Sequence, residues 1–290
     1  MLVSKNVATF IGADATYEEA KVILFGAPFD STTSYRPGTR FASSSIRKES
    51  FGLEIYSPYQ DVELDEKAVC DVGDLELPFG NARKALQIIE NQTAQIISDN
   101  KIPLLIGGEH LVTYGSVKAL AQKYPDLHII HFDAHSDLRE DYMGEALSHA
   151  TVLRRCHDLL GDQRIFQFGI RSGDKAEFEF AKTHVVQERF TCNTLKSVVT
   201  SLKGKPIYLT VDLDVLDPSQ FPATGTPEAG GWDFNTLRTA IMDVLSLNVV
   251  GLDVNELNPM LDATGQSTAL AGKIIREIII GLTKEVVETI

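Results

Sequence analysis

Short apolar runs alternate with segments of helical spacing along most of the chain. Runs of five to seven mostly apolar residues are typical of buried strands, and they occur at 21–26, 68–72, 102–106, 127–132, 164–170, 207–211 and 248–254. Between them, apolar residues that recur every three or four positions predict helices at 81–99, 111–123, 148–160, 193–202, 233–245 and 268–288. Ser148 and Asp233 stand where the N-caps of two of these helices are expected.

This alternation predicts the fold class. Strands separated by helical connections pair in parallel, and helices then cover both faces of the sheet. We therefore expect an α/β fold with three layers, in which a parallel sheet lies between two layers of helices. A closed (β/α)₈ barrel is the alternative that the same alternation allows. No linker and no change in composition divides the 290 residues, so a single domain over residues 1–290 is expected.

Composition and charge exclude several classes of function. The 40 acidic residues outnumber the 27 basic ones and give a net charge of −13, which argues against a nucleic-acid partner and attracts small cations. The apolar stretch 274–282 is too short to cross a membrane. Three widely spaced cysteines without a Cys-x-x-Cys motif fit free thiols in the cytoplasm. The motifs typical of dinucleotide-binding enzymes, phosphate-loop enzymes and serine hydrolases are absent from the sequence.

Acidic and imidazole side chains follow three of the predicted strands. Gly-Gly-Glu-His follows 102–106, Asp-Ala-His-Ser-Asp follows 127–132, and Asp-Leu-Asp follows 207–211. Residues two apart in an extended chain face the same side, and the carboxyl ends of parallel strands meet at one edge of the sheet. We therefore expect these side chains to converge: His110, Asp133, His135, Asp137, Asp212 and Asp214.

Such a cluster predicts a metal site. Crowded carboxylates repel one another unless cations neutralise them, and two divalent cations would offset the charges of four aspartates. Four carboxylates and two imidazoles without a thiolate suit Mn²⁺ better than structural Zn²⁺. For any one of these motifs alone, a turn or a helix cap is the simpler explanation.

Taken together, the motifs resemble those of the ureohydrolase family, the arginases and agmatinases. Five strings occur in the family's order: Gly-Gly-Glu-His, Asp-Ala-His-Ser-Asp, Ser-His-Ala, Asp-Leu-Asp-Val-Leu-Asp-Pro and Asn-Glu-Leu-Asn-Pro. The resemblance covers residues 10–283 and implies one three-layer α/β domain with a parallel sheet of about eight strands. It also implies two Mn²⁺ ions per subunit and assembly as a homotrimer or homohexamer.

The resemblance assigns ligands to each metal. One Mn²⁺ ion would be bound by His110, Asp133, Asp137 and Asp212. The other would be bound by Asp133, His135, Asp212 and Asp214, so that Asp133 and Asp212 bridge the pair. The expected reaction is attack by hydroxide on the carbon of a guanidinium group, because a metal pair lowers the pKa of water. Asp137 is expected to pass a proton to the leaving amine.

Three more residues receive roles from the resemblance. Glu256 is expected to pair with the substrate guanidinium, His149 to exchange protons, and Thr226 to line the site. Each has a structural alternative: a loop or helix-cap acid, a packed histidine and a plain turn, respectively. Asp253 is expected to support the ligands without touching metal. The other histidines are interpreted as structural or surface residues: His128, His131, His157 and His184.

The expected substrate is agmatine, a small dication, with urea and putrescine as products. The stretch 35–47 resembles agmatinases, whereas the loop 138–145 lacks the Asn/Ser pattern with which arginases hold the amino acid head group. Arg139, in contrast, would attract a carboxylate group, so 4-guanidinobutyrate stays an alternative substrate. Arginase, formimidoylglutamase and a noncatalytic metal-binding regulator of the same fold are further alternatives. Three acids of this loop suit the tail amine of agmatine: Glu140, Asp141 and Glu145.

Overall fold

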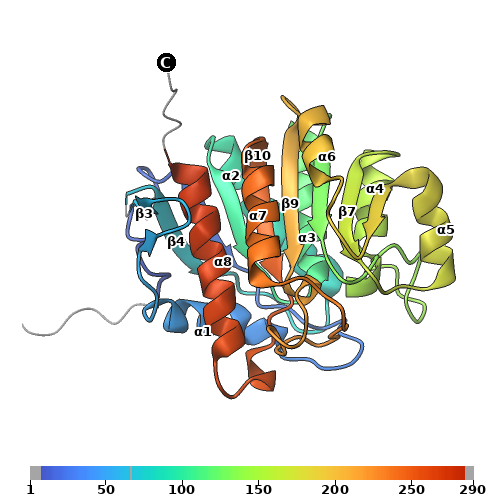
Figure 1. Cartoon of the computed structure of the whole chain (residues 1–290), viewed down its shortest axis with the longest axis horizontal. Helices are drawn as coiled ribbons and strands as arrows, with labels where there is room; N and C mark the ends of the chain where they lie inside the picture. Colours follow the sequence, from blue (N-terminus) through green and yellow to red (C-terminus); the bar gives the residue numbers. More distant parts are fainter. Residues whose placement is uncertain (1–7, 66, 285–290) are drawn as a thin grey trace, which may run out of the picture.

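The computed structural model describes residues 8–65 and 67–284, and a single eight-stranded sheet lies at its centre. The strands are β1 (Val22–Gly26), β4 (Val69–Asp74), β5 (Ile102–Ile106), β6 (His128–Phe132), β7 (Ile165–Ile170), β8 (Val186–Arg189), β9 (Pro206–Asp212) and β10 (Asn248–Asn255). They lie in the order β4–β1–β5–β10–β9–β6–β7–β8, with all neighbours parallel (Figure 1). A short antiparallel pair, β2 (Tyr56–Ser57) and β3 (Val62–Glu63), stands apart.

Helices cover both faces of the sheet (Figure 1). One layer contains α1 (Ala42–Ser50), α6 (Leu195–Ser201), α7 (Phe234–Leu245) and α8 (Gln266–Thr283). The other contains α2 (Ala82–Ser98), α3 (Thr113–Lys123), α4 (Val152–Leu160) and α5 (Lys175–His184). This arrangement confirms the predicted three-layer α/β class.

Burial on both faces explains why the strand sequences are runs of mostly apolar residues. All five residues of β6 are buried, and so are all six of β7. Helices α2, α7 and α8 bury apolar stripes, as the periodicity predicts. Ile274 and Ile278 of α8 join the core on one side, and Ala85 and Ile89 of α2 join it on the other.

The structure also corrects parts of the prediction. The seven predicted strands are present to within two residues, but β8 was not predicted, because Val-Gln-Glu-Arg at the sheet edge has no apolar run. Helices α1 and α5 were not predicted either. The sheet is open in the described part of the chain, with β4 and β8 at its edges, so the barrel alternative is wrong. The predicted end of the last helix, at residue 288, lies outside the described residues. Within those residues, no helix has the length and apolar character that a membrane span needs.

The strand order brings the chemically important segments together. Strands β5, β10, β9 and β6 are consecutive neighbours, and all point the same way. The segments that follow them therefore meet at the carboxyl edge of the sheet, where open α/β sheets bind their ligands.

Candidate metal centre and active-site pocket

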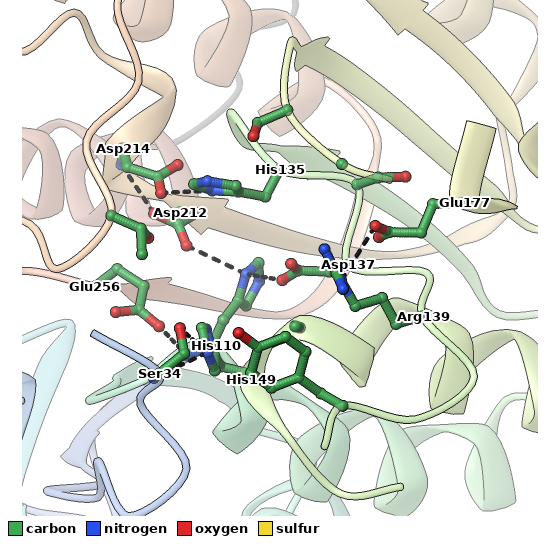
Figure 2. A pocket seen from close by; sticks show the side chains of 16 residues that line it. Ser34, His110, His135, Asp137, Arg139, His149, Glu177, Asp212, Asp214 and Glu256 are labelled. Carbon is green, nitrogen blue, oxygen red and sulfur yellow. Dashed lines mark hydrogen bonds and ion pairs between the residues drawn. The ribbon is translucent and has the colours of Figure 1, made fainter. Parts of the chain in front are cut away.

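The segments that follow β5, β6, β9 and β10 surround one pocket (Figure 2). Its cavity of about 170 Å³ suits a small metabolite, since drug-sized ligands occupy roughly 300–1,000 Å³. Asp133 is fully buried behind the pocket wall. The other eight predicted site residues line the cavity: His110, His135, Asp137, His149, Asp212, Asp214, Thr226 and Glu256.

The first cluster of donors surrounds the imidazole of His110, which is buried. Three carboxylate oxygens lie around its Nδ1: Asp133 Oδ2 at 3.1 Å, Asp137 Oδ2 at 3.2 Å and Asp212 Oδ2 at 3.3 Å. Nevertheless, His110 Nδ1 has no hydrogen-bond partner among the described residues. A buried nitrogen without a partner, facing three carboxylates, is a donor set that suits a metal ion.

The other ring nitrogen of His110 explains why Nδ1 is free to ligate. His110 Nε2 lies 2.9 Å from Thr210 Oγ1. Thr210 in turn donates its hydroxyl proton to Asp253 Oδ1 at 2.6 Å, so its oxygen must accept the proton of His110 Nε2. When the His110 ring is neutral, its proton is therefore on Nε2 and its lone pair is on Nδ1. Asp253 thus contacts His110 through the hydroxyl of Thr210.

A second cluster lies beside the first. His135 Nδ1 lies 2.9 Å from Asp214 Oδ2 and 3.5 Å from Asp133 Oδ1. Asp214 Oδ2 is buried and accepts no hydrogen bond within the described part of the chain. Asp133 thus faces His110 with one oxygen and His135 with the other, a placement in which one carboxylate could serve two cations.

Paired backbone and turns together produce this convergence, since His135 forms a parallel bridge with Ser172. Strand β6 ends at Phe132, and Asp137 has a φ of 54°, in the left-handed region. Strand β9 ends at Asp212, whose Oδ1 accepts the amide proton of Asp214 at 2.8 Å at the start of a 3₁₀ turn, Leu213–Val215. The expected convergence is therefore present, and the extension on which it depends continues as far as His135 after β6 but ends at Asp212 after β9.

The electrostatics of the clusters fit divalent cations. Burial and the charge of Asp133 raise the pKa of Asp137 to about 7. Burial, followed by the charges of Asp214 and Asp133, raises the pKa of Asp212 well above its ordinary value. Asp137 and Asp212 therefore bind protons more readily than ordinary carboxylates unless a cation neutralises them, whereas the neighbouring imidazoles hold the pKa of Asp133 well below its ordinary value despite its burial. The donor set of oxygen and imidazole nitrogen suits Mn²⁺, so the residues present fit the implied metal pair.

Glu256 faces the same pocket from the end of β10 (Figure 2). It is buried, has a φ of 66°, and donates its amide proton to Gly108 O at 3.0 Å. Its Oε1 accepts the amide proton of His110 at 2.7 Å. Burial raises the pKa of its carboxyl well above the ordinary value. One oxygen of Glu256 thus supports the loop, and the side chain still borders the cavity where a substrate cation would sit.

Comparison with known proteins identifies the family. Residues 20–281 match the Arginase family. The chain belongs to this family. It is 48% identical over 280 residues to an agmatinase of Bacillus cereus, covering 95% of this chain and 96% of that protein. It is 47% identical over 279 residues to an agmatinase of Bacillus subtilis, with the same two shares.

A solved structure shows the same fold. The agmatine ureohydrolase of Thermoplasma volcanium has a TM-score of 0.89 and 35% sequence identity, covering 96% of this chain and 95% of that one. The predicted resemblance to ureohydrolases, and to agmatinases among them, is confirmed. The predicted enzyme class, a hydrolase of amidine C–N bonds, is confirmed with it.

In this arginase-family pocket, His149 lies at the rim. It begins a 3₁₀ turn that Ser148 caps, as predicted. Its Nε2 lies 3.1 Å from Ser34 Oγ, and its ring meets Tyr142 edge-on at 6.2 Å. Burial lowers the pKa of His149 to about 4. Thr226 lines the cavity from the loop that follows β9.

Three acids of the loop 138–145, which were predicted to attract the substrate tail, do not border the pocket. Glu140, Asp141 and Glu145 are exposed and do not line the pocket. Glu177 of α5 lines it instead, and no sequence motif marked that position. Arg139 also lines the pocket, and its Nε lies 3.3 Å from Glu177 Oε2. Thr210 was missed as well, because inside an apolar strand nothing distinguishes a supporting hydroxyl from a packed one.

Proposed function

We propose that this protein is an agmatinase that hydrolyses agmatine to urea and putrescine with two Mn²⁺ ions bound per subunit. The observation that carries the metal assignment is the position of Asp133, whose two oxygens face two different imidazoles. Relatives described as agmatinases along nearly the whole chain support the choice of substrate.

The proposed metal ligands are the residues of the two clusters. One Mn²⁺ would be held by His110, Asp133, Asp137 and Asp212, and the other by Asp133, His135, Asp212 and Asp214. When bound, the metal pair supplies hydroxide near neutral pH by lowering the pKa of water.

The protein's own residues supply the rest of the chemistry. The Glu256 carboxylate pairs with the guanidinium and fixes its carbon in the pocket. Asp137 accepts the proton of the attacking water at a carboxylate oxygen and returns it to the departing amine. The resemblance gives His149 at the rim the role of exchanging protons with solvent between turnovers, although a pKa of about 4 leaves its ring neutral near pH 7. The products are urea and a primary amine.

The charge around Arg139 favours a cationic substrate tail over an acidic one. Its guanidinium lies 3.3 Å from a Glu177 oxygen and 3.5 Å from an Asp174 oxygen. Two carboxylates already balance its charge, so little attraction remains for the carboxylate of 4-guanidinobutyrate. The tail of agmatine is an ammonium group, which is attracted by the one negative charge that Glu177 and Asp174 carry in excess of Arg139.

Urea release from three substrates tests this assignment. With Mn²⁺ present, we expect kcat/KM for agmatine to exceed that for arginine and 4-guanidinobutyrate by about 100-fold, since a misplaced carboxylate costs several kcal/mol. Preference for 4-guanidinobutyrate would make the protein a guanidino acid hydrolase, and preference for arginine would make it an arginase. No urea from any of the three, with metal bound, would favour the noncatalytic regulator.

Four further properties complete the proposal. Strands from residue 22 to residue 255 share one sheet, which supports a single domain over the chain. Free cysteines at 70, 156 and 192 support a cytoplasmic location. Assembly as a homotrimer or homohexamer, and a place in putrescine biosynthesis, follow from the family resemblance.

A further inference from the structure

His131 contacts the carboxylate that the two clusters share. It lies in the middle of β6, fully buried, and its ring centroid is 5.1 Å from that of His110. Its Nε2 lies 2.7 Å from Asp133 Oδ2, the same oxygen that lies 3.1 Å from His110 Nδ1. The expectation that His131 has no role at the site does not fit this contact.

The hydrogen bonds of Gln167 determine which nitrogen of His131 carries the proton. Gln167 Nε2 donates to the backbone oxygen of Ser136 at 2.7 Å, and Gln167 Oε1 accepts from Gln187 Nε2 at 2.9 Å. These two contacts fix the orientation of the amide, because a carbonyl oxygen accepts only from the amide nitrogen. The same Nε2 lies 3.0 Å from His131 Nδ1, which must therefore accept. The proton of His131 resides on Nε2 and points at Asp133.

We propose that His131 is a positioning residue for the metal centre, held by Gln167 in the tautomer that donates to Asp133. The proposal rests on the metal site proposed above and adds a residue to it. With its proton on Nε2, His131 offers no lone pair toward the clusters, so it supports a ligand and does not serve as one. This hydrogen bond, with the one that Asp133 Oδ1 accepts from the backbone amide of His135, fixes the rotation of the carboxylate, so that Oδ2 faces His110 and Oδ1 faces His135.

Paired substitutions test whether this hydrogen bond matters. In His131→Gln, the side-chain amide places a donor close to the position of imidazole Nε2, whereas His131→Leu fills similar space without a donor. His128→Leu is the matched control, because His128 is also buried in β6 but bonds to the backbone oxygen of Asp126. Mn²⁺ affinity and stoichiometry are measured by calorimetry on the metal-free full-length proteins, and their melting temperatures report folding.

We expect His131→Leu to bind Mn²⁺ about 10- to 100-fold more weakly than the wild type, which is the usual effect of losing a hydrogen bond to a ligand. His131→Gln should stay within about threefold of the wild type, and His128→Leu should be unchanged. Equal affinity in His131→Leu and wild type would overturn the proposal, and so would equal loss in the Leu and Gln variants. If the wild type itself bound no Mn²⁺, the proposed function would fail instead.

A second, spectroscopic measurement of the His131 tautomer is made on the wild type itself. In the metal-free wild type, the ¹⁵N chemical shifts of the histidine rings report which nitrogen is protonated. Comparison with His131→Gln assigns the His131 signals. We expect a protonated Nε2 and an unprotonated Nδ1. A proton on Nδ1 would overturn the assignment, since the ring could then not donate to Asp133.

Discussion

Replacing Asp133 with asparagine is expected to abolish urea release, with a loss of about 10³-fold or more. Asp133 lies between the two imidazoles, 3.1 Å from His110 Nδ1 and 3.5 Å from His135 Nδ1. An amide has no negative charge and has only one oxygen, so it can no longer serve two cations. Fewer than two Mn²⁺ ions per chain should remain, as measured by elemental analysis of the purified variant beside an assay of urea.

A matched control separates loss of charge from loss of fold. Asp243→Asn makes the same chemical change on α7, away from the pocket, and should leave turnover and metal content unchanged. Asp133→Asn that kept two Mn²⁺ ions and turned over agmatine at the control rate would contradict the shared-carboxylate arrangement.

The second large effect is expected from Glu256→Gln. Removing one partner of a buried charged pair costs roughly 3 kcal/mol, so kcat/KM for agmatine should fall about a hundredfold. Metal content should not change, because Glu256 is not among the proposed ligands. Steady-state kinetics and elemental analysis on the same preparation measure both quantities.

This substitution also distinguishes the two interpretations of Glu256. Glutamine keeps an oxygen that can accept the amide proton of His110, the 2.7 Å bond that Glu256 makes now. If Glu256 only supports the loop, the variant should be nearly as active as the wild type. If it pairs with the guanidinium, the loss of charge must appear in catalysis although the melting temperature stays the same.

Much of the fold and the metal cluster could be predicted because both depend on local patterns. Burial on both faces leaves an apolar run in each central strand, and the carboxyl-edge rule then places the residues that follow. His110, Asp133 and Asp214 were found in this way. Strand β8 escaped prediction because an edge strand need not be apolar.

The missed residues depend on contacts that no local pattern encodes. His131 and Thr210 lie inside buried strands, and only the register of β6 beside β9 shows that they are neighbours. The side-chain directions in the loop 138–145 were predicted wrongly for the same reason, because the path of an irregular loop depends on packing. Glu177 Oε1 accepts the amide proton of Leu138 at 2.9 Å, and Glu177 borders the cavity. The acids of the loop 138–145 are exposed.

The most direct measurement is anomalous scattering at the manganese absorption edge from crystals grown with Mn²⁺. The proposed centre predicts two peaks per chain, one beside His110 Nδ1 and one beside His135 Nδ1, with an oxygen of Asp133 next to each. Manganese absent from both positions in a protein that still releases urea from agmatine would contradict it.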